Sequence, residues 1–166
     1  ETKDWSKTWF TAGYIYEKIL EDQQKKEITK SDDKKLRGES TIKAYDYFVK
    51  AYELDQLPDE KGQIKPKYTK NITTYMKTYP IELFNYGVLL YGEKNYTGAV
   101  DAWERYLNMP NLPFLKDAGI GGPTDSIYIF ATYYTATGSI INGDNDKAIK
   151  YLEQVKDKYM INESYQ

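Results

Sequence analysis

Seven residues in one short stretch recur at the spacings that a single antiparallel helix hairpin requires. They are Leu83, Tyr86, Gly87, Leu90, Tyr96, Ala99 and Trp103. The large apolar residues of the first half are three and four positions apart, which is the spacing of one helix face. Gly87 and Ala99, twelve residues apart, are small enough to let two helix backbones cross closely. Tyr96 and Trp103 would fill the space around that crossing, so the stretch predicts two packed helices joined by a turn at residues 92–95.

The same register recurs twice more in the chain, with interruptions. Earlier, it is formed by Trp9, Ala12, Gly13, Tyr16, Ala44, Phe48 and Ala51, and later by Ile127, Phe130, Ala131, Tyr134, Ala148, Leu152 and Val155. Gly13 and Ala44 are 31 residues apart rather than twelve. The extra residues fall in 22–40, a stretch so dense in charged and amide side chains that we expect a solvated loop or a frayed helix extension.

Between the hairpins lie two connectors with different expected structures. Aromatic and apolar residues at spacings of three and four predict an additional amphipathic helix at 66–79, ended by Pro80. Residues 111–123 are rich in Pro and Gly and predict a long loop. In the third hairpin, Asp144 or Asn145 is the expected cap of the last helix. No alternating apolar run is bounded by hairpin turns, so we expect no sheet.

These hairpins resemble the units of the tetratricopeptide repeat (TPR) family, which are helix pairs of about 34 residues. The resemblance implies an all-α fold, a TPR-type right-handed α-α superhelix of about three repeats plus one inserted helix, in a single domain. Its expected parts are repeat 1 at 4–56 with a long loop at 22–40, the inserted helix at 66–79, repeat 2 at 80–110, the loop at 111–123 and repeat 3 at 124–160.

Three segments resemble a narrower group within that family. Residues 51–55, 61–68 and 106–113 are similar to bacterial extracytoplasmic TPR proteins of greater length. This implies an exported protein, located in the periplasm or cell envelope, of which the chain would be one part.

Composition excludes several kinds of chemistry. The 166 residues include no Cys and no His, which excludes disulfides, thiol chemistry, zinc sites built on those residues and His-based catalysis. The 23 basic and 25 acidic residues are well mixed, which argues against nucleic acid as a partner. Apolar runs are too short to cross a bilayer, so we expect no membrane insertion.

The resemblance also implies where a partner would bind, because TPR units present the inner, concave face of each first helix to other chains. The matching positions include Phe10, Tyr14, Glu17, Phe84, Val88, Tyr91, Tyr128 and Thr132. We therefore expect a non-enzymatic scaffold or adaptor that holds a segment of another protein in this groove, with no cofactor and no metal. An alternative is that the inserted helix fills the groove and these rings are core.

A second hypothesis is carbohydrate binding, because sugar rings stack on exposed aromatic side chains. The 18 tyrosines make such platforms available, for example Tyr45, Tyr47, Phe48 and Tyr52, or Tyr128, Tyr133 and Tyr134. Catalysis is a third class, for which the adjacent acids Asp32–Asp33 and Asp59–Glu60 are the candidates. Both pairs lie in polar segments where solvated charges are expected, so we expect no enzyme.

Overall fold

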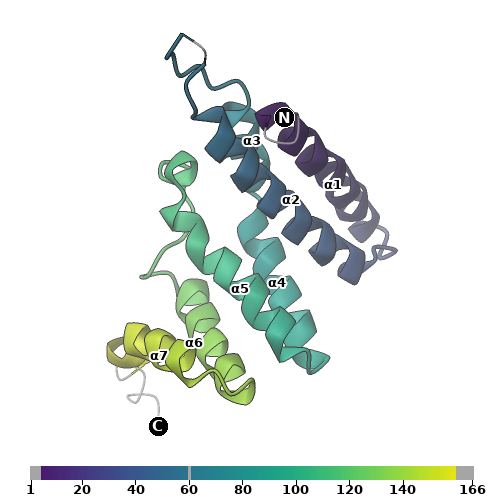
Figure 1. The fold of residues 1–166 in the computed structure, drawn as a ribbon. Coiled ribbons are helices and arrows are strands. Elements are labelled where there is room, and N and C mark those ends of the chain that lie inside the picture. Colours follow the sequence, from purple (N-terminus) through teal and green to yellow (C-terminus); the bar gives the residue numbers. More distant parts are fainter. Residues whose placement is uncertain (1–4, 60, 160–166) are drawn as a thin grey trace. The chain divides into compact units, whose positions relative to one another are not determined.

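The regular structure is entirely α-helical and 3₁₀-helical in the residues that the structure, a computed structural model, describes, which are 5–59 and 61–159 (Figure 1). The all-α expectation is confirmed. The elements are α1 (Ser6–Glu27), α2 (Lys34–Asp55), α3 (Thr69–Met76), α4 (Tyr79–Gly92), α5 (Tyr96–Asn108), η2 (Met109–Asn111), η3 (Pro113–Leu115), α6 (Ser126–Ile141) and α7 (Asn145–Tyr159). None of the described helices is both long and apolar enough to cross a membrane.

Two compact units make up the chain, residues 1–82 and residues 83–166, and α4 passes from one into the other after its first turn. Whether the two units together form the single domain expected from the sequence depends on their arrangement, so that expectation stays a prediction.

The first unit is built on the antiparallel hairpin of α1 and α2, which lie side by side (Figure 1). They approach each other closely at Gly13, where an added Cβ would lie 2.6 Å from Cδ1 of Phe48. Phe48 is fully buried at this crossing. Ile72 and Met76 of α3 are also fully buried, so the inserted helix contributes to the core of this unit.

The turn of this hairpin is much shorter than the loop expected at residues 22–40. α1 continues to Glu27 and α2 already begins at Lys34, so most of that stretch is helical. Asp33 caps α2, its Oδ1 accepting from the backbone N–H groups of Lys35 and Leu36 at 3.0 and 2.9 Å. The residues that these helix ends bury are small or polar, among them Gln23, Gly38 and Ser40, so hydrophobic periodicity does not reveal them.

A long connection joins α2 to α3 and is closed by one carboxylate. Asp55, which is 6% exposed, ends α2. Its two oxygens accept from the backbone N–H groups of Lys67, Tyr68 and Thr69 at 2.8–3.1 Å. Three donors at the start of α3 are thereby satisfied. The inserted helix is confirmed, but it covers Thr69–Met76 rather than the expected 66–79.

The second unit contains the hairpins α4–α5 and α6–α7. At Gly87 an added Cβ would overlap Nε1 of Trp103, which repeats the pairing of Gly13 with Phe48 in the first unit. Trp103 is 1% exposed and its Nε1–H donates to the carbonyl of Phe84 at 3.2 Å. A third close approach joins α5 to α6, where a Cβ at Gly138 would lie 2.7 Å from Cγ2 of Val100.

Loops and caps of the second unit follow the expectations in part. Asp144 caps α7, as expected, its Oδ1 accepting from the N–H of Lys147 at 3.1 Å. The connection expected as a loop at 111–123 begins with the short helical turns η2 and η3. Leu112 and Leu115 are buried there, which makes the start of this segment part of the core rather than a solvated loop.

The crossing at Gly87 yields a stability prediction. Gly87→Ala places a methyl group against the indole of Trp103, which is buried and hydrogen-bonded and so cannot move aside cheaply. We expect the free energy of unfolding to fall by about 1–3 kcal/mol. Urea denaturation followed by circular dichroism measures it. The matched control is Gly92→Ala at the end of the same helix, where a Cβ would have open space within 4 Å. Equal behaviour of the two variants would contradict the close crossing.

Candidate functional site

The predicted concave residues of the first hairpin are covered by the segment that follows it. The ring of Phe10 stacks on that of Tyr68 with centroids 4.5 Å apart, and the ring of Tyr14 lies 5.9 Å from that of Tyr75. Phe10 is half-buried, whereas Tyr14 remains 37% exposed. α3 and the residue before it therefore cover this face. In the first hairpin, this arrangement corresponds to the alternative expectation, in which the inserted helix fills the groove.

Glu17, the third predicted residue of this hairpin, is 5% exposed and not available to a partner. The hydroxyl of Tyr79 donates to its Oε2 at 2.5 Å. Burial raises the pKa of the Glu17 carboxyl, and the acidic groups of Glu21 and Glu82 raise it further, against the Tyr79 hydrogen bond and the charge of Lys18. Its role is to hold the start of α4 against α1.

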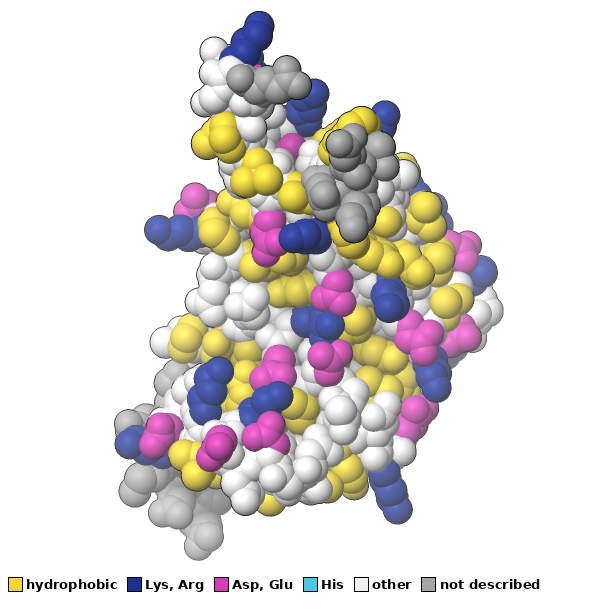
Figure 2. Space-filling view, viewed as in Figure 1, with side chains coloured by type: hydrophobic (Ala, Val, Ile, Leu, Met, Phe, Trp, Pro, Cys, Tyr) yellow, Lys and Arg dark blue, Asp and Glu magenta, His cyan; other side chains and the backbone are white. Residues whose placement is uncertain are grey.

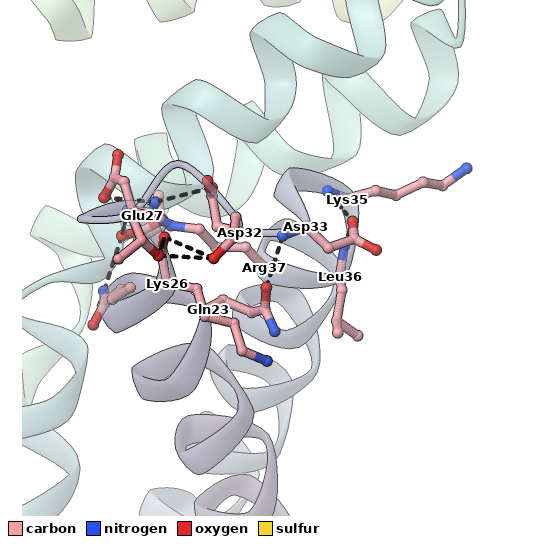
Figure 3. Close-up of polar contacts among 12 residues, drawn as sticks. Gln23, Lys26, Glu27, Asp32, Asp33, Lys35, Leu36 and Arg37 are labelled. Carbon is pink, nitrogen blue, oxygen red and sulfur yellow. Dashed lines mark hydrogen bonds and ion pairs between the residues drawn. The ribbon is translucent and has the colours of Figure 1, made fainter.

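A second buried carboxylate, Glu82, braces the same turn of α4. The guanidinium of Arg37 donates to both of its oxygens, Nε to Oε2 at 2.6 Å and Nη2 to Oε1 at 2.7 Å. Nε2 of Gln24 donates to Oε1 at 2.9 Å. Nη1 of Arg37 also pairs with Glu27 at 2.7 Å and lies 3.7 Å from Asp32, a cluster that the labelled side chains of Figure 3 show at the α1–α2 turn.

These acids are the chain's strongest candidates for unusual chemistry, and each is already engaged. Glu17 and Glu82 both accept from donors of their own unit, and Asp33 of the adjacent pair serves as a helix cap. Asp32 has one buried oxygen with no hydrogen-bond partner, facing Arg37. Among the described residues, no group of three or more acidic side chains is placed to hold a metal ion. The arrangement braces three helices against one another.

In the second unit, the predicted residues of α4 differ in exposure. Phe84 is half-buried, with its ring centroid 6.1 Å from that of Tyr106 and its carbonyl bound to Trp103. Val88 is 50% exposed. Tyr91 is half-buried and rests on the ring of Trp103, 5.8 Å away. Val88 is therefore a surface residue, whereas Phe84 and Tyr91 are each half-buried against a ring of α5.

The predicted residues of α6 point inward, which corrects their placement on the surface. Tyr128 is half-buried and its hydroxyl donates to the carbonyl of Leu107 on α5 at 3.2 Å. Thr132 is 1% exposed and its hydroxyl donates to the carbonyl of Tyr128 at 2.7 Å. The physical reason is that α6 packs through its small side chains, including Ala131 and Ala136, which are fully buried.

That packing leaves the α6 tyrosines 133 and 134 exposed, and they cluster with one tyrosine of α4 and one of α5. We call Tyr91, Tyr96, Tyr133 and Tyr134 the tyrosine surface. Tyr91 is central, with ring centroids 5.0 Å from Tyr96 and 5.8 Å from Tyr134, and Tyr133 lies 5.7 Å from Tyr134. Tyr133 and Tyr134 are each 36% exposed. Trp103 lies beneath, 5.6 Å from Tyr134.

The proximity of the four side chains affects the titration of Tyr91. Burial raises the pKa of the Tyr91 hydroxyl, and the hydroxyls of Tyr96, Tyr134 and Tyr133 raise it further, in that order. Among the described residues, the groups that contribute to this shift besides burial are other tyrosine hydroxyls. Elsewhere, acidic and basic side chains are interspersed on the face that Figure 2 shows.

Exposed apolar side chains extend the tyrosine surface along both helices. Val88 lies one turn before Tyr91 on α4, and Phe130, 50% exposed, lies one turn before Tyr134 on α6. The sequence register places Phe130 and Tyr134 on the first helix of the third hairpin, and Tyr133 and Tyr134 are also named there, with Tyr128, as a possible glycan platform. The sequence does contain a signal for their exposure. Small residues recur on one face of α6, so that face packs inward and the large side chains lie on the opposite, exposed face.

No protein-family model, curated protein or solved structure matches the chain.

The buried carboxyl of Glu17 predicts a pH-dependent stability. Its pKa in the folded unit lies above the ordinary 4.5, so the folded form binds more protons between those two values and stability falls as pH rises through them. Glu17→Gln removes this loss and keeps an acceptor for Tyr79. In thermal denaturation, we expect Glu17→Gln to exceed the parent chain in stability by a larger margin at pH 7 than at pH 4. Glu53→Gln, on an exposed side chain, is the control, and parallel pH curves for Glu17→Gln and the parent chain would refute the prediction.

Arg37 provides a second prediction about the same turn. Arg37→Met leaves the buried carboxylate of Glu82 without its ion pair, and breaking a buried pair in this way costs about 3–5 kcal/mol. We expect Arg37→Met/Glu82→Leu to recover part of the loss, because the carboxylate of residue 82 is then no longer buried without a partner, whereas Asp32 still lacks Arg37. Lys50→Met breaks an exposed pair with Glu53 and should cost at most about 1 kcal/mol. Chemical denaturation compares the three, and a loss in Arg37→Met no larger than in Lys50→Met would argue against the brace.

Proposed function

We propose that this chain is part of a TPR-type helical repeat protein and acts as a non-enzymatic scaffold that binds a segment of another protein. The observation that carries the proposal is the tyrosine surface of the second unit, with Val88 and Phe130 beside it. The binding face assigned here is narrower than the groove expected from sequence, because the rings of the first hairpin are covered by α3.

The repeat character is supported by one pairing that occurs in both units. A glycine of the first helix meets a large ring of the second helix at Gly13 and Phe48, and again at Gly87 and Trp103. Both pairs stand at the same positions of the sequence register. Such hairpins expose one face of each first helix after stacking, and repeat proteins use that face to bind other chains.

Binding of a protein segment is favoured by the kind of side chain that is exposed. Tyrosine supplies a large contact area with only two side-chain torsions to fix, so it loses little conformational entropy when a partner binds. Aromatic residues are enriched at interfaces for the same reason. The rings of the tyrosine surface are already held by one another and by Trp103, so part of that ordering precedes binding.

Carbohydrate binding is the second candidate, favoured by the exposure of Tyr133 and Tyr134. A sugar ring could stack on either face and bind a neighbouring hydroxyl. The resemblance to extracytoplasmic TPR proteins leads us to propose a location outside the cytoplasm, where glycans and proteins are both available as ligands.

The exposed pair beside the tyrosine surface provides the test. Val88→Asp/Phe130→Asp changes two half-exposed side chains on α4 and α6, so we expect the helical content to remain and partner binding to fall at least tenfold, because charge is introduced where apolar contact is needed. Affinity capture from a bacterial cell-envelope extract, quantified by mass spectrometry, measures it.

The matched control makes the same chemical change elsewhere. Ile15→Asp/Ile149→Asp alters two side chains that are each 56% exposed, on α1 and α7. Proteins captured by the parent chain and by this control but lost with Val88→Asp/Phe130→Asp would support the assignment. Equal capture by all three would refute it, and binding of oligosaccharides alone would favour the second candidate.

A further inference from the structure

We propose that the second unit carries a site of oxidative modification, at which Tyr91 and Tyr96 join in a dityrosine cross-link. The inference goes beyond the proposed function, because it concerns the reactivity of the two rings and not what binds to them. It is carried by the contact between these rings, by the turn that fixes their positions and by the further oxidisable rings that touch Tyr91.

The rings of Tyr91 and Tyr96 are in edge-to-face contact. Their centroids lie 5.0 Å apart and their planes meet at 75°, an arrangement in which the edge of one ring touches the face of the other. The other tyrosine pairs of the tyrosine surface are wider: Tyr91 and Tyr134 have centroids 5.8 Å apart, and Tyr133 and Tyr134 5.7 Å. Within this surface, the carbons of Tyr91 and Tyr96 therefore have the shortest distance to cover before a bond can form.

The turn between α4 and α5 holds these two residues in place. Tyr91 is the last residue but one of α4, and Tyr96 is the first of α5. The backbone N–H groups of residues 93–95 donate to carbonyls in the last turn of α4 at 2.9–3.1 Å, and Oδ1 of Asn95 accepts from the N–H of Gly98 at 3.0 Å. Reactive groups that are held side by side react much faster than the same groups free in solution, so coupling within this pair is favoured over coupling between molecules.

Tyr91 also touches other rings that can lose an electron. Tyr134 is 36% exposed, and the buried ring of Trp103 lies 5.8 Å from that of Tyr91 and 5.6 Å from that of Tyr134. Rings in contact exchange single electrons readily. Nε1–H of Trp103 donates to the carbonyl of Phe84, which is too weak a base to take the proton. A tyrosine at the surface can instead lose its phenol proton to water, so the unpaired electron settles on a tyrosine.

The reaction requires a one-electron oxidant, and the class that we assign is a haem peroxidase acting with hydrogen peroxide. Each of the two phenols loses one electron and one proton, and one molecule of peroxide takes up both electrons and both protons to give two molecules of water. The two tyrosyl radicals then form one carbon–carbon bond between the ring carbons beside their oxygens. The hydrogen on each of these carbons moves to the neighbouring oxygen, which restores both phenols.

The experiment treats the full chain at low concentration with a haem peroxidase and hydrogen peroxide. The monomer is isolated under denaturing conditions, its dityrosine fluorescence is measured and it is digested with trypsin. Lys94 lies between the two tyrosines, so trypsin separates their peptides unless a covalent bond joins them. We expect a joined peptide pair that has lost two hydrogen atoms, with the bond located at Tyr91 and Tyr96 by fragmentation.

Removal of single hydroxyls tests the assignment of the pair. Tyr91→Phe and Tyr96→Phe keep both rings but remove a phenol that must be oxidised, and each should lower the dityrosine fluorescence of the monomer at least about twofold. The matched control is Tyr16→Phe, which removes a phenol from a tyrosine pair of the first unit whose centroids are 5.7 Å apart. This variant should keep the fluorescence of the parent chain. Circular dichroism checks that all three variants are folded.

Three results would overturn the inference. They are a monomer without the joined peptides, a bond from Tyr91 to Tyr134 in place of Tyr96, and equal fluorescence in Tyr91→Phe and the parent chain. None of them bears on the scaffold function, because partner capture by the parent chain and by Val88→Asp/Phe130→Asp is measured without an oxidant.

Discussion

Close approach of helices at glycine is the constraint on which both units depend. Gly13 and Gly87 each leave the space that a large ring fills, and that ring comes from the second helix of the same hairpin. Phe48 and Trp103 are thereby fully buried without a gap between the helices. Because dense packing tolerates neither a void nor an added methyl group at such a point, the glycine and the ring must be considered together.

Polar side chains hold the first turn of α4, which the glycine crossings do not position. The first turn of α4 is held by two carboxylates, Glu17 bound to Tyr79 and Glu82 bound to Arg37. Buried ion pairs add little net stability over an apolar equivalent, but an arrangement that breaks one is penalised. Other rotations of this turn against α1 and α2 would leave a buried charge or hydroxyl unpaired.

Sequence reasoning predicts the parts of this fold that rest on apolar spacing and fails where small or polar residues are buried. The crossings at Gly13 and Gly87 and the helix after residue 66 follow from periodicity and side-chain size. The helical ends within residues 22–40 do not, because their buried contacts are made by Gln23, Gly38 and Arg37 rather than by apolar residues. In the candidate site, Val88 is exposed and Tyr91 is half-buried, whereas Thr132 is buried.

α6 explains both the failure at Thr132 and the existence of the tyrosine surface. Burying Thr132, Thr135 and Ser139 would ordinarily cost free energy, but each hydroxyl donates to the carbonyl four residues before it at 2.7 Å. The polar face is thus satisfied within its own helix and can pack closely against its neighbours. The large side chains are then left outside: Ile127, Phe130 and Tyr134, at spacings of three and four, remain 36–50% exposed. A helix that buries its small residues and exposes its large ones gives up apolar burial within the unit, and contact with a partner would recover it.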